Sequence, residues 1–211
     1  INMTNGGTLQ IRTSWTTTNE TFTPGTGTIN WTVTGAGSTL PAAITTYYKL
    51  TITASTQTTT LGVNTTVNNN LTITSGTLAP STFNFTVTGT TSVDGTYSDA
   101  SNTGTNIFVG GVTINAGGTW TTTSSTTTGT YVFRGGIVNN GTAFSAGGAT
   151  FNTNSQALSG STTLSFANIV TVTGAAVVVT NNGTVTITST AAASLAGTGG
   201  WTQGTGSTLN Y

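Results

Sequence analysis

The sequence predicts an all-β protein whose chain winds as a right-handed parallel β-solenoid over residues 1–211, as a single domain. Three observations support this prediction. Threonine and glycine dominate the composition, short segments alternate apolar with polar residues, and glycines recur about every 20 residues. A right-handed coil is expected because crossovers between parallel strands are almost always right-handed.

The composition favours strands and tight corners over helices. The 211 residues include 59 threonines, 29 glycines and only three prolines. Threonine is β-branched and suits a half-buried pleated surface, whereas glycine permits the backbone angles of tight turns. Charged residues make up 3% of the chain, with net charge zero, although an ordinary domain carries roughly a quarter. Solubility must therefore come from hydroxyl and amide groups.

Short segments of alternating apolar and polar residues mark the expected strands. Such alternation indicates a strand with one buried face, and the 34% apolar content argues against a disordered linker. These segments are 31–33, 50–52, 71–73, 83–87, 112–114, 131–133, 164–166, 170–172 and 185–187. The residues expected to point inward are Leu50, Ile52, Leu71, Ile73, Phe85, Val87, Val112, Ile114, Phe133, Val170, Val172 and Ile187. No helix longer than one turn is expected, because the helix-forming run 191–195 is too short.

Glycines that precede a small residue and then a hydrophobe set the repeat. They are Gly76, Gly95, Gly118, Gly141, Gly160 and Gly183. Successive members of this series are roughly 20 residues apart, and a nearly constant period of this length is typical of one solenoid coil. Asp94, Asn140 and Asn182 precede three of these glycines, which predicts left-handed backbone at those corners. Stacked asparagines are expected to add side-chain amide ladders.

The main rival fold is a β-sandwich, which also has short alternating strands, but sandwich sequences do not repeat at a fixed coil length. A longer echo relates residues 21–30 to 142–152 and residues 50–53 to 170–173. The chain is therefore expected to be a section of a longer protein with a repeated unit of about 120 residues. Roughly nine or ten coils would form a rod on the order of 45 Å long.

Few residues are suited to catalysis or metal binding. The chain has no histidine or cysteine, and its only acidic side chains are Glu20, Asp94 and Asp99. These three are therefore the only candidates for acid–base catalysis. Asp94 and Asp99 lie close together in the sequence, but the basic residues that would bind an acidic sugar beside them are scattered. Calcium would need more oxygen ligands than Asp94, Asp99 and Asn102 provide. We therefore predict a non-enzymatic protein without metal or cofactor, in which the aspartates serve as turn residues.

Surface recognition leaves more options open. Eight glycosylation sequons begin at Asn2, Asn19, Asn30, Asn64, Asn70, Asn84, Asn140 and Asn182. The four tryptophans, which are more often core residues than a sugar platform, are Trp15, Trp31, Trp120 and Trp201. Pairs of threonines similar to those of ice-binding β-solenoids occur at 51/53, 72/74, 86/88, 171/173 and 184/186. Their uneven intervals along the sequence indicate a broken array.

Two classes of partner are disfavoured by the same features. Zero net charge argues against nucleic-acid binding, because phosphate contacts require clustered lysine and arginine. The sequence has no apolar run long enough to cross a bilayer, so no transmembrane segment is predicted.

Several segments resemble the β-strand repeats of giant Bacteroidota-type surface proteins and filamentous adhesins. They are residues 47–52, 63–78, 139–142 and 199–209. The resemblance implies secretion, cell-surface display and contact with a cell or substratum, and it assigns no functional residue. Residues 1–11 and 201–211 show no device that would cap a strand edge, which favours contact with further coils or other copies.

The expected function is therefore that of an extracellular structural protein: a stalk, filament or adhesin repeat that associates with other copies and with surface glycans. Two alternatives remain open. One is a polysaccharide- or ice-binding module, and the other is a polysaccharide-degrading β-helix enzyme.

Overall fold

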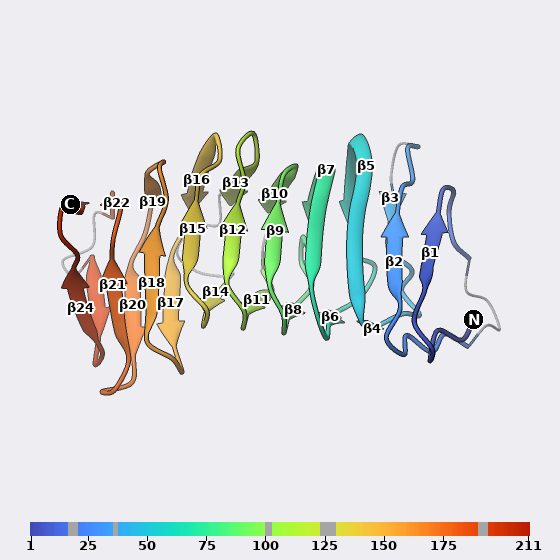
Figure 1. Ribbon diagram of the computed structural model, residues 1–211, viewed down its shortest axis with the longest axis horizontal. Helices are drawn as coiled ribbons and strands as arrows, with labels where there is room; N and C mark the ends of the chain where they lie inside the picture. Colours follow the sequence, from blue (N-terminus) through green and yellow to red (C-terminus); the bar gives the residue numbers. More distant parts are fainter. Residues whose placement is uncertain (17–20, 36–37, 100–102, 123–129, 190–193) are drawn as a thin grey trace.

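The chain forms a rod of stacked β-coils. The computed structural model describes residues 1–16, 21–35, 38–99, 103–122, 130–189 and 194–211, and within these ranges it contains strands, turns and loops but no helix. The termini lie at opposite ends of the rod (Figure 1). Neighbouring strands pair in parallel from coil to coil, which confirms the β-solenoid and excludes a sandwich of antiparallel hairpins.

The described strands form three stacks, one on each side of the coil. Stack A contains β1 (Thr8–Ile11), β2 (Thr28–Trp31), the first parts of β5 (Lys49–Thr60) and β7 (Leu71–Ala79), β9 (Thr91–Val93), β12 (Val112–Ile114), β15 (Ile137–Asn139), β18 (Gln156–Ser159), β21 (Val178–Asn181) and β24 (Gly200–Gln203). Stack B contains β3 (Ser38–Thr39), the second parts of β5 and β7, β10 (Thr96–Asp99), β13 (Thr119–Thr122), β16 (Ala143–Ala146), β19 (Leu164–Phe166), β22 (Thr184–Ile187) and β25 (Thr208–Asn210). Stack C contains β4 (Thr46–Tyr47), β6 (Thr65–Val67), β8 (Phe85–Val87), β11 (Thr105–Phe108), β14 (Thr130–Phe133), β17 (Ala149–Asn152), β20 (Val170–Thr173) and β23 (Leu195–Gly197). Because β5 and β7 cross the corner without a break, stacks A and B join into one 17-stranded sheet, and stack C is an 8-stranded sheet.

One continuous apolar core fills the interior of the rod. All twelve residues predicted to point inward are at most 2% exposed. Strands of all three stacks alternate buried and partly buried positions, as β6 and β10 do. The period-two alternation of the sequence therefore identified the inner surface correctly.

Aromatic side chains stack along the interior because parallel register places equivalent positions of successive coils about 4.8 Å apart. In stack B the ring of Trp120 lies between those of Tyr97 and Phe144, at centroid distances of 4.0 Å and 5.7 Å. In stack C, Phe133 lies 5.6 Å from Phe108 and 5.6 Å from Phe151. These offset stacks add to the burial energy of the rings and fix the register of the coils.

The repeated glycines stack on one another at the corner between stacks A and B. A Cβ atom on Gly95 would lie 2.7 Å from the carbonyl oxygen of Gly76, and one on Gly141 would lie 2.5 Å from that of Gly118. The amide of Thr142 also donates to the Gly118 carbonyl at 2.8 Å. The glycine period of the sequence therefore arises from close backbone contact between successive coils.

The expected left-handed backbone at Asp94, Asn140 and Asn182 is wrong. Positive φ outside glycine occurs, among the residues described, at Ser55, Ser81 and Thr153. Two of these corners, those at Asn140 and Asn182, are held instead by the asparagine one position earlier. The Asn139 side-chain oxygen accepts the Gly141 amide at 3.2 Å, and that of Asn181 accepts the Gly183 amide at 3.0 Å.

The expected asparagine ladders, in which side-chain amides bond one another, are replaced by hydrogen bonds from backbone amides to asparagine side chains. At another corner the Asn64 side-chain oxygen accepts the backbone amide of Asn84 at 2.9 Å, and the Asn84 side-chain oxygen accepts that of Thr105 at 2.7 Å. Asn70 accepts the Thr90 amide at 3.1 Å. These contacts join a side chain to the backbone of the next coil, because corner backbone that lacks a strand partner needs an acceptor.

Coil length varies although the register of the strands does not. Leu71 pairs with Thr91, whereas Val112 pairs with Ile137, so the second of these coils is the longer one. The extra residues lie between the strands. The two segments related by the longer echo, residues 21–30 and 142–152, contain β2 of stack A and β17 of stack C, so they occupy different sides of the coil. The larger repeated unit stays a prediction.

We expect the Gly141→Ala substitution to lower the free energy of unfolding by about 1–3 kcal/mol, because the added methyl group meets backbone that cannot rotate away. Denaturant titration followed by circular dichroism measures the change. The Gly35→Ala variant is the control, because a Cβ there has no atom within 4 Å. An equal loss in both variants would contradict the close-packed glycine corner.

Candidate functional site

The two aspartates singled out from the sequence do not share a groove. Asp94 is exposed at the corner between stacks A and B, whereas Asp99 is 1% exposed and points into the core from β10. The paired-carboxylate geometry of a glycoside hydrolase is therefore not formed by these two groups. Glu20 and Asn102 lie outside the described residues. Within the described ranges, no cluster of three or more His, Cys, Asp or Glu residues is positioned to hold a metal ion.

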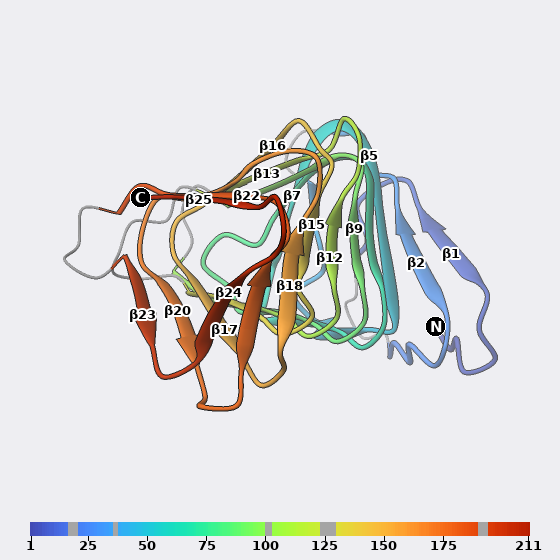
Figure 2. The same ribbon diagram turned by 60° about the vertical axis from the view of Figure 1, so that its left-hand side comes forward.

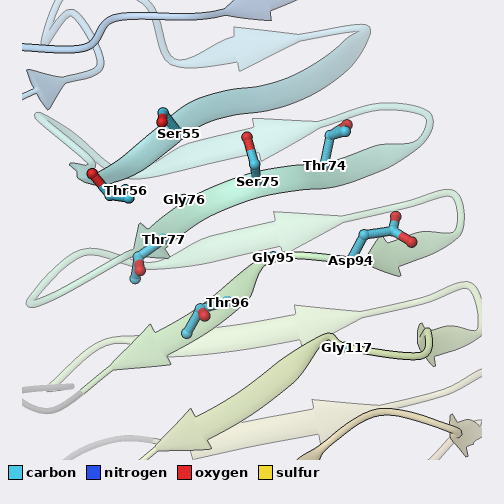
Figure 3. A pocket seen from close by; sticks show the side chains of 10 residues that line it. All are labelled: Ser55, Thr56, Thr74, Ser75, Gly76, Thr77, Asp94, Gly95, Thr96 and Gly117. Atoms are coloured by element: carbon cyan, nitrogen blue, oxygen red, sulfur yellow. The ribbon is translucent and has the colours of Figure 1, made fainter.

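A shallow groove of about 370 Å³ runs along the glycine corner (Figure 3). Its lining consists of Ser55, Thr56, Thr74, Ser75, Gly76, Thr77, Asp94, Gly95, Thr96 and Gly117. The Asp94 carboxylate accepts a 3.0 Å hydrogen bond from the Asn115 side chain, which also donates to the Ser92 hydroxyl at 2.9 Å. Asp94 is the only ionisable side chain of this lining. The groove can offer hydroxyl hydrogen bonds, but it has no acid–base pair.

A second polar cluster is enclosed in the core near β10, β11 and β14. The Tyr131 hydroxyl donates to the Asp99 carboxylate at 3.0 Å, and the Tyr97 hydroxyl donates to the Asn106 side-chain oxygen at 3.0 Å. Burial raises the pKa of Asp99 from 3.8 to about 6, although the hydrogen bond from Tyr131 partly opposes this shift. The cluster is therefore poised to change charge near neutral pH.

The outer surface of stack B is a regular array of small side chains in two rows. Row 1 contains Thr58, Thr77, Thr96, Thr119, Ala143, Thr163, Thr184 and Thr208. Row 2 contains Thr39, Thr60, Ala79, Ser98, Thr121, Ser145, Ser165, Thr186 and Asn210. Buried residues, most of them aromatic or aliphatic, alternate with these positions along the strands.

Stacks A and C present less regular outer surfaces. The central outward row of stack A contains Gln10, Asn30, Thr51, Thr72, Ser92, Thr113, Val138 and Ser159, and Lys49 lies beside it. The corresponding row of stack C contains Thr46, Thr66, Thr86, Ile107, Val132, Thr150, Thr171 and Ala196. Both rows change in size and polarity from coil to coil.

The threonine pairs recognised in the sequence lie on different sides of the rod. Residues 51/53 and 72/74 belong to stack A, 86/88 and 171/173 to the stack C side, and 184/186 to stack B. As their uneven intervals indicated, these pairs do not form one array, but a regular array does exist on stack B. Thr77 pairs with Thr96, and Thr119 pairs with Ala143 across a longer coil, because the corners absorb the difference. Sequence reasoning missed row 1, although the threonine directly after four of the six repeated glycines was its signal.

The tryptophans and sequon asparagines can also be placed. Trp31 and Trp120 are fully buried, as expected for core residues, and Trp15 and Trp201 pack partly buried against the core. Six of the seven described sequon asparagines are exposed: Asn2, Asn64, Asn70, Asn84, Asn140 and Asn182. Asn30 is half-buried on stack A, where its side chain accepts a 3.1 Å hydrogen bond from Thr53. Asn19 lies outside the described residues.

The fold defines a parallel β-solenoid with a nearly uncharged surface. No protein-family model, curated protein or solved structure matches the chain. The part of the chain that the structure describes has no helix capable of spanning a membrane. Functional inference therefore depends on the geometry of this molecule.

We expect stability to depend on the ionisation of Asp99. Because the pKa is higher in the folded state than the ordinary value, the stabilising contribution is complete below about pH 4 and is lost as the pH rises through 6. The difference between 3.8 and about 6 corresponds to a loss of up to about 3 kcal/mol. Thermal melts between pH 4 and pH 8 measure it.

Asp99→Asn should remove this pH dependence, while the matched Asp94→Asn variant should keep it. A wild-type melting temperature that does not fall between pH 4 and pH 8 would show that Asp99 is not the buried titrating group.

Proposed function

We propose that the chain is a rod-shaped structural segment of an extracellular surface or filament protein, which associates end to end with further copies in the manner of an adhesin stalk. The observation that supports this proposal is the parallel stacking of the coils, which leaves at each end of the described rod a strand edge that adjoining coils or another copy would pair. At one end β1 pairs only with β2, and at the other β25 pairs only with β22 among the described strands. Edges of this kind are templates for another parallel strand.

Apolar side chains lie at the same two ends. Leu9 and Ile11 of β1 are only partly buried against the core, as are Leu195, Trp201 and Leu209 at the other end. A second copy stacked in register would cover these side chains and pair the open edge at once. Because the two ends are different surfaces, their contact is head-to-tail and produces an open filament rather than a closed dimer.

The charge distribution supports the same association. Three basic and three acidic residues in 211 leave no net charge to repel a second copy. The resemblance to surface-protein and filamentous-adhesin repeats, together with the scarcity of lysine and glutamate, favours an extracellular location. The exposed asparagine, serine and threonine side chains offer hydrogen bonds to surface glycans.

Gln10→Pro tests the assembly without removing pairing inside the rod. The carbonyls of Gly7 and Ile11 accept hydrogen bonds from Thr28 of β2 and from Thr32, which directly follows it. Because alternate residues of a strand turn their amides to opposite sides, the amide of Gln10 points toward the open edge. Proline at this position removes the outward donor and blocks an added strand. We expect wild-type protein to form filaments with increasing concentration and Gln10→Pro to remain monomeric, by light scattering and electron microscopy.

The Gln10→Ala variant is the matched control. It also removes the hydrogen bonds that Arg12 donates to the Gln10 side chain, but it keeps the backbone amide. Filaments in Gln10→Ala but not in Gln10→Pro are the expected outcome. Monodisperse wild-type monomers at high concentration would contradict end-to-end association.

A further inference from the structure

We propose that the outer surface of stack B, defined by rows 1 and 2, binds the surface of ice. The two rows run in parallel along the rod, and the strands that carry them lie side by side in Figure 2, where β7, β13, β16, β22 and β25 follow one side of the molecule. This inference is independent of end-to-end association, because it concerns a side of the rod and not its ends.

The spacing of the array is set by the β-sheet itself. Successive coils place equivalent side chains about 4.8 Å apart, and rows 1 and 2 occupy alternate positions along each strand, about 6.7 Å apart. Nine strands extend this lattice over roughly 40 Å. Hexagonal ice repeats its oxygen atoms at a similar pair of distances on its prism faces. One side chain can therefore meet an equivalent lattice position at every coil.

The side chains suit a lattice of water. Each threonine combines a hydroxyl group that donates and accepts hydrogen bonds with a methyl group that orders the adjacent water. The β-branched side chain has restricted χ1 freedom, so the side chain loses little conformational entropy when it becomes fixed against ordered water. At the edge of row 2 the hydroxyls of Thr39 and Thr60 lie 2.9 Å apart, which shows the coil-to-coil alignment.

Charge and size separate stack B from the other sides. None of the described positions in rows 1 and 2 is charged or aromatic. Lys49 lies on stack A, Asp94 lies at the corner between stacks A and B beside row 1, and Arg134 follows β14 of stack C. A protein partner is usually held by aromatic and arginine anchors, and a sugar ring by an aromatic platform. A neutral array without such anchors matches a neutral crystal surface.

Small side chains, most of them with hydroxyl groups, also occupy rows 1 and 2 where the coils differ in length. The coil that separates Thr119 from Ala143 is longer than the coil that separates Thr77 from Thr96, yet the register is continuous. A surface needed only for solubility has no reason to exclude glutamine, lysine and branched aliphatic residues from one stack while both other stacks accept some of them. Apart from Asn210 at the end of row 2, the two rows contain only threonine, serine and alanine. The contrast identifies stack B as the side with a specific ligand.

The test makes the same substitution, threonine to tyrosine, on two consecutive strands that face different sides of the rod. Thr121→Tyr places a bulky ring in the centre of row 2, and Thr113→Tyr places the same ring on β12 of stack A. Thermal hysteresis and inhibition of ice recrystallisation are measured for the wild type and both variants, with circular dichroism melts to confirm folding. We expect Thr121→Tyr to reduce activity about tenfold, equivalent to about 1.4 kcal/mol of binding, and Thr113→Tyr to leave it unchanged.

The smaller replacement Thr121→Val retains shape and a methyl group but removes the hydroxyl group, so it provides a second readout if the tyrosine variant fails to fold. We expect its loss of activity to be partial. No hysteresis and no recrystallisation inhibition in wild-type protein at high concentration would overturn the proposal, as would equal losses in Thr121→Tyr and Thr113→Tyr. Retention on insoluble cellulose or chitin without any effect on ice would overturn the assignment of ice as the ligand.

Discussion

Parallel pairing of each coil with the next in one fixed register determines the whole molecule. Because Leu50 pairs with Leu71 and Ile52 with Ile73, apolar residues meet apolar residues from coil to coil and the interior becomes a single core. The same register stacks Tyr97, Trp120 and Phe144 inside and the small hydroxyl residues outside. A slip of one residue would turn every aromatic outward, so the core and the outer array depend on one constraint.

Alternation and glycine period were enough to predict the fold class and the inner surface. They could not assign each strand to a side, since Thr51 of stack A and Thr186 of stack B stand in nearly identical local sequence. Assignment requires the length of every corner, and those lengths vary. The sequence also predicted the same role, that of turn residues, for Asp94 and Asp99. Asp99 lies two positions after the inward-facing Tyr97, however, and alternation along a strand therefore indicated that its side chain is buried.

The strands keep the register of the coils, and the corners accommodate differences in coil length. Glycine at the corner between stacks A and B permits close backbone contact, while Asn139 and Asn181 satisfy corner amides that have no strand partner. The corners thereby tolerate coils of unequal length without disturbing the strands. The polar cluster around Asp99 interrupts a largely apolar core, and it places the one strongly perturbed carboxyl group of the described chain inside the rod.

The position of the two termini at opposite ends of the rod has a mechanical consequence. A pull on these ends acts along the direction in which the inter-coil hydrogen bonds lie, so the coil with the weakest contacts opens first and the others follow one at a time. Each coil of about 21 residues then releases roughly 70 Å of extended chain. Under tension the molecule lengthens in steps and dissipates work at each one, while it stays stiff against bending.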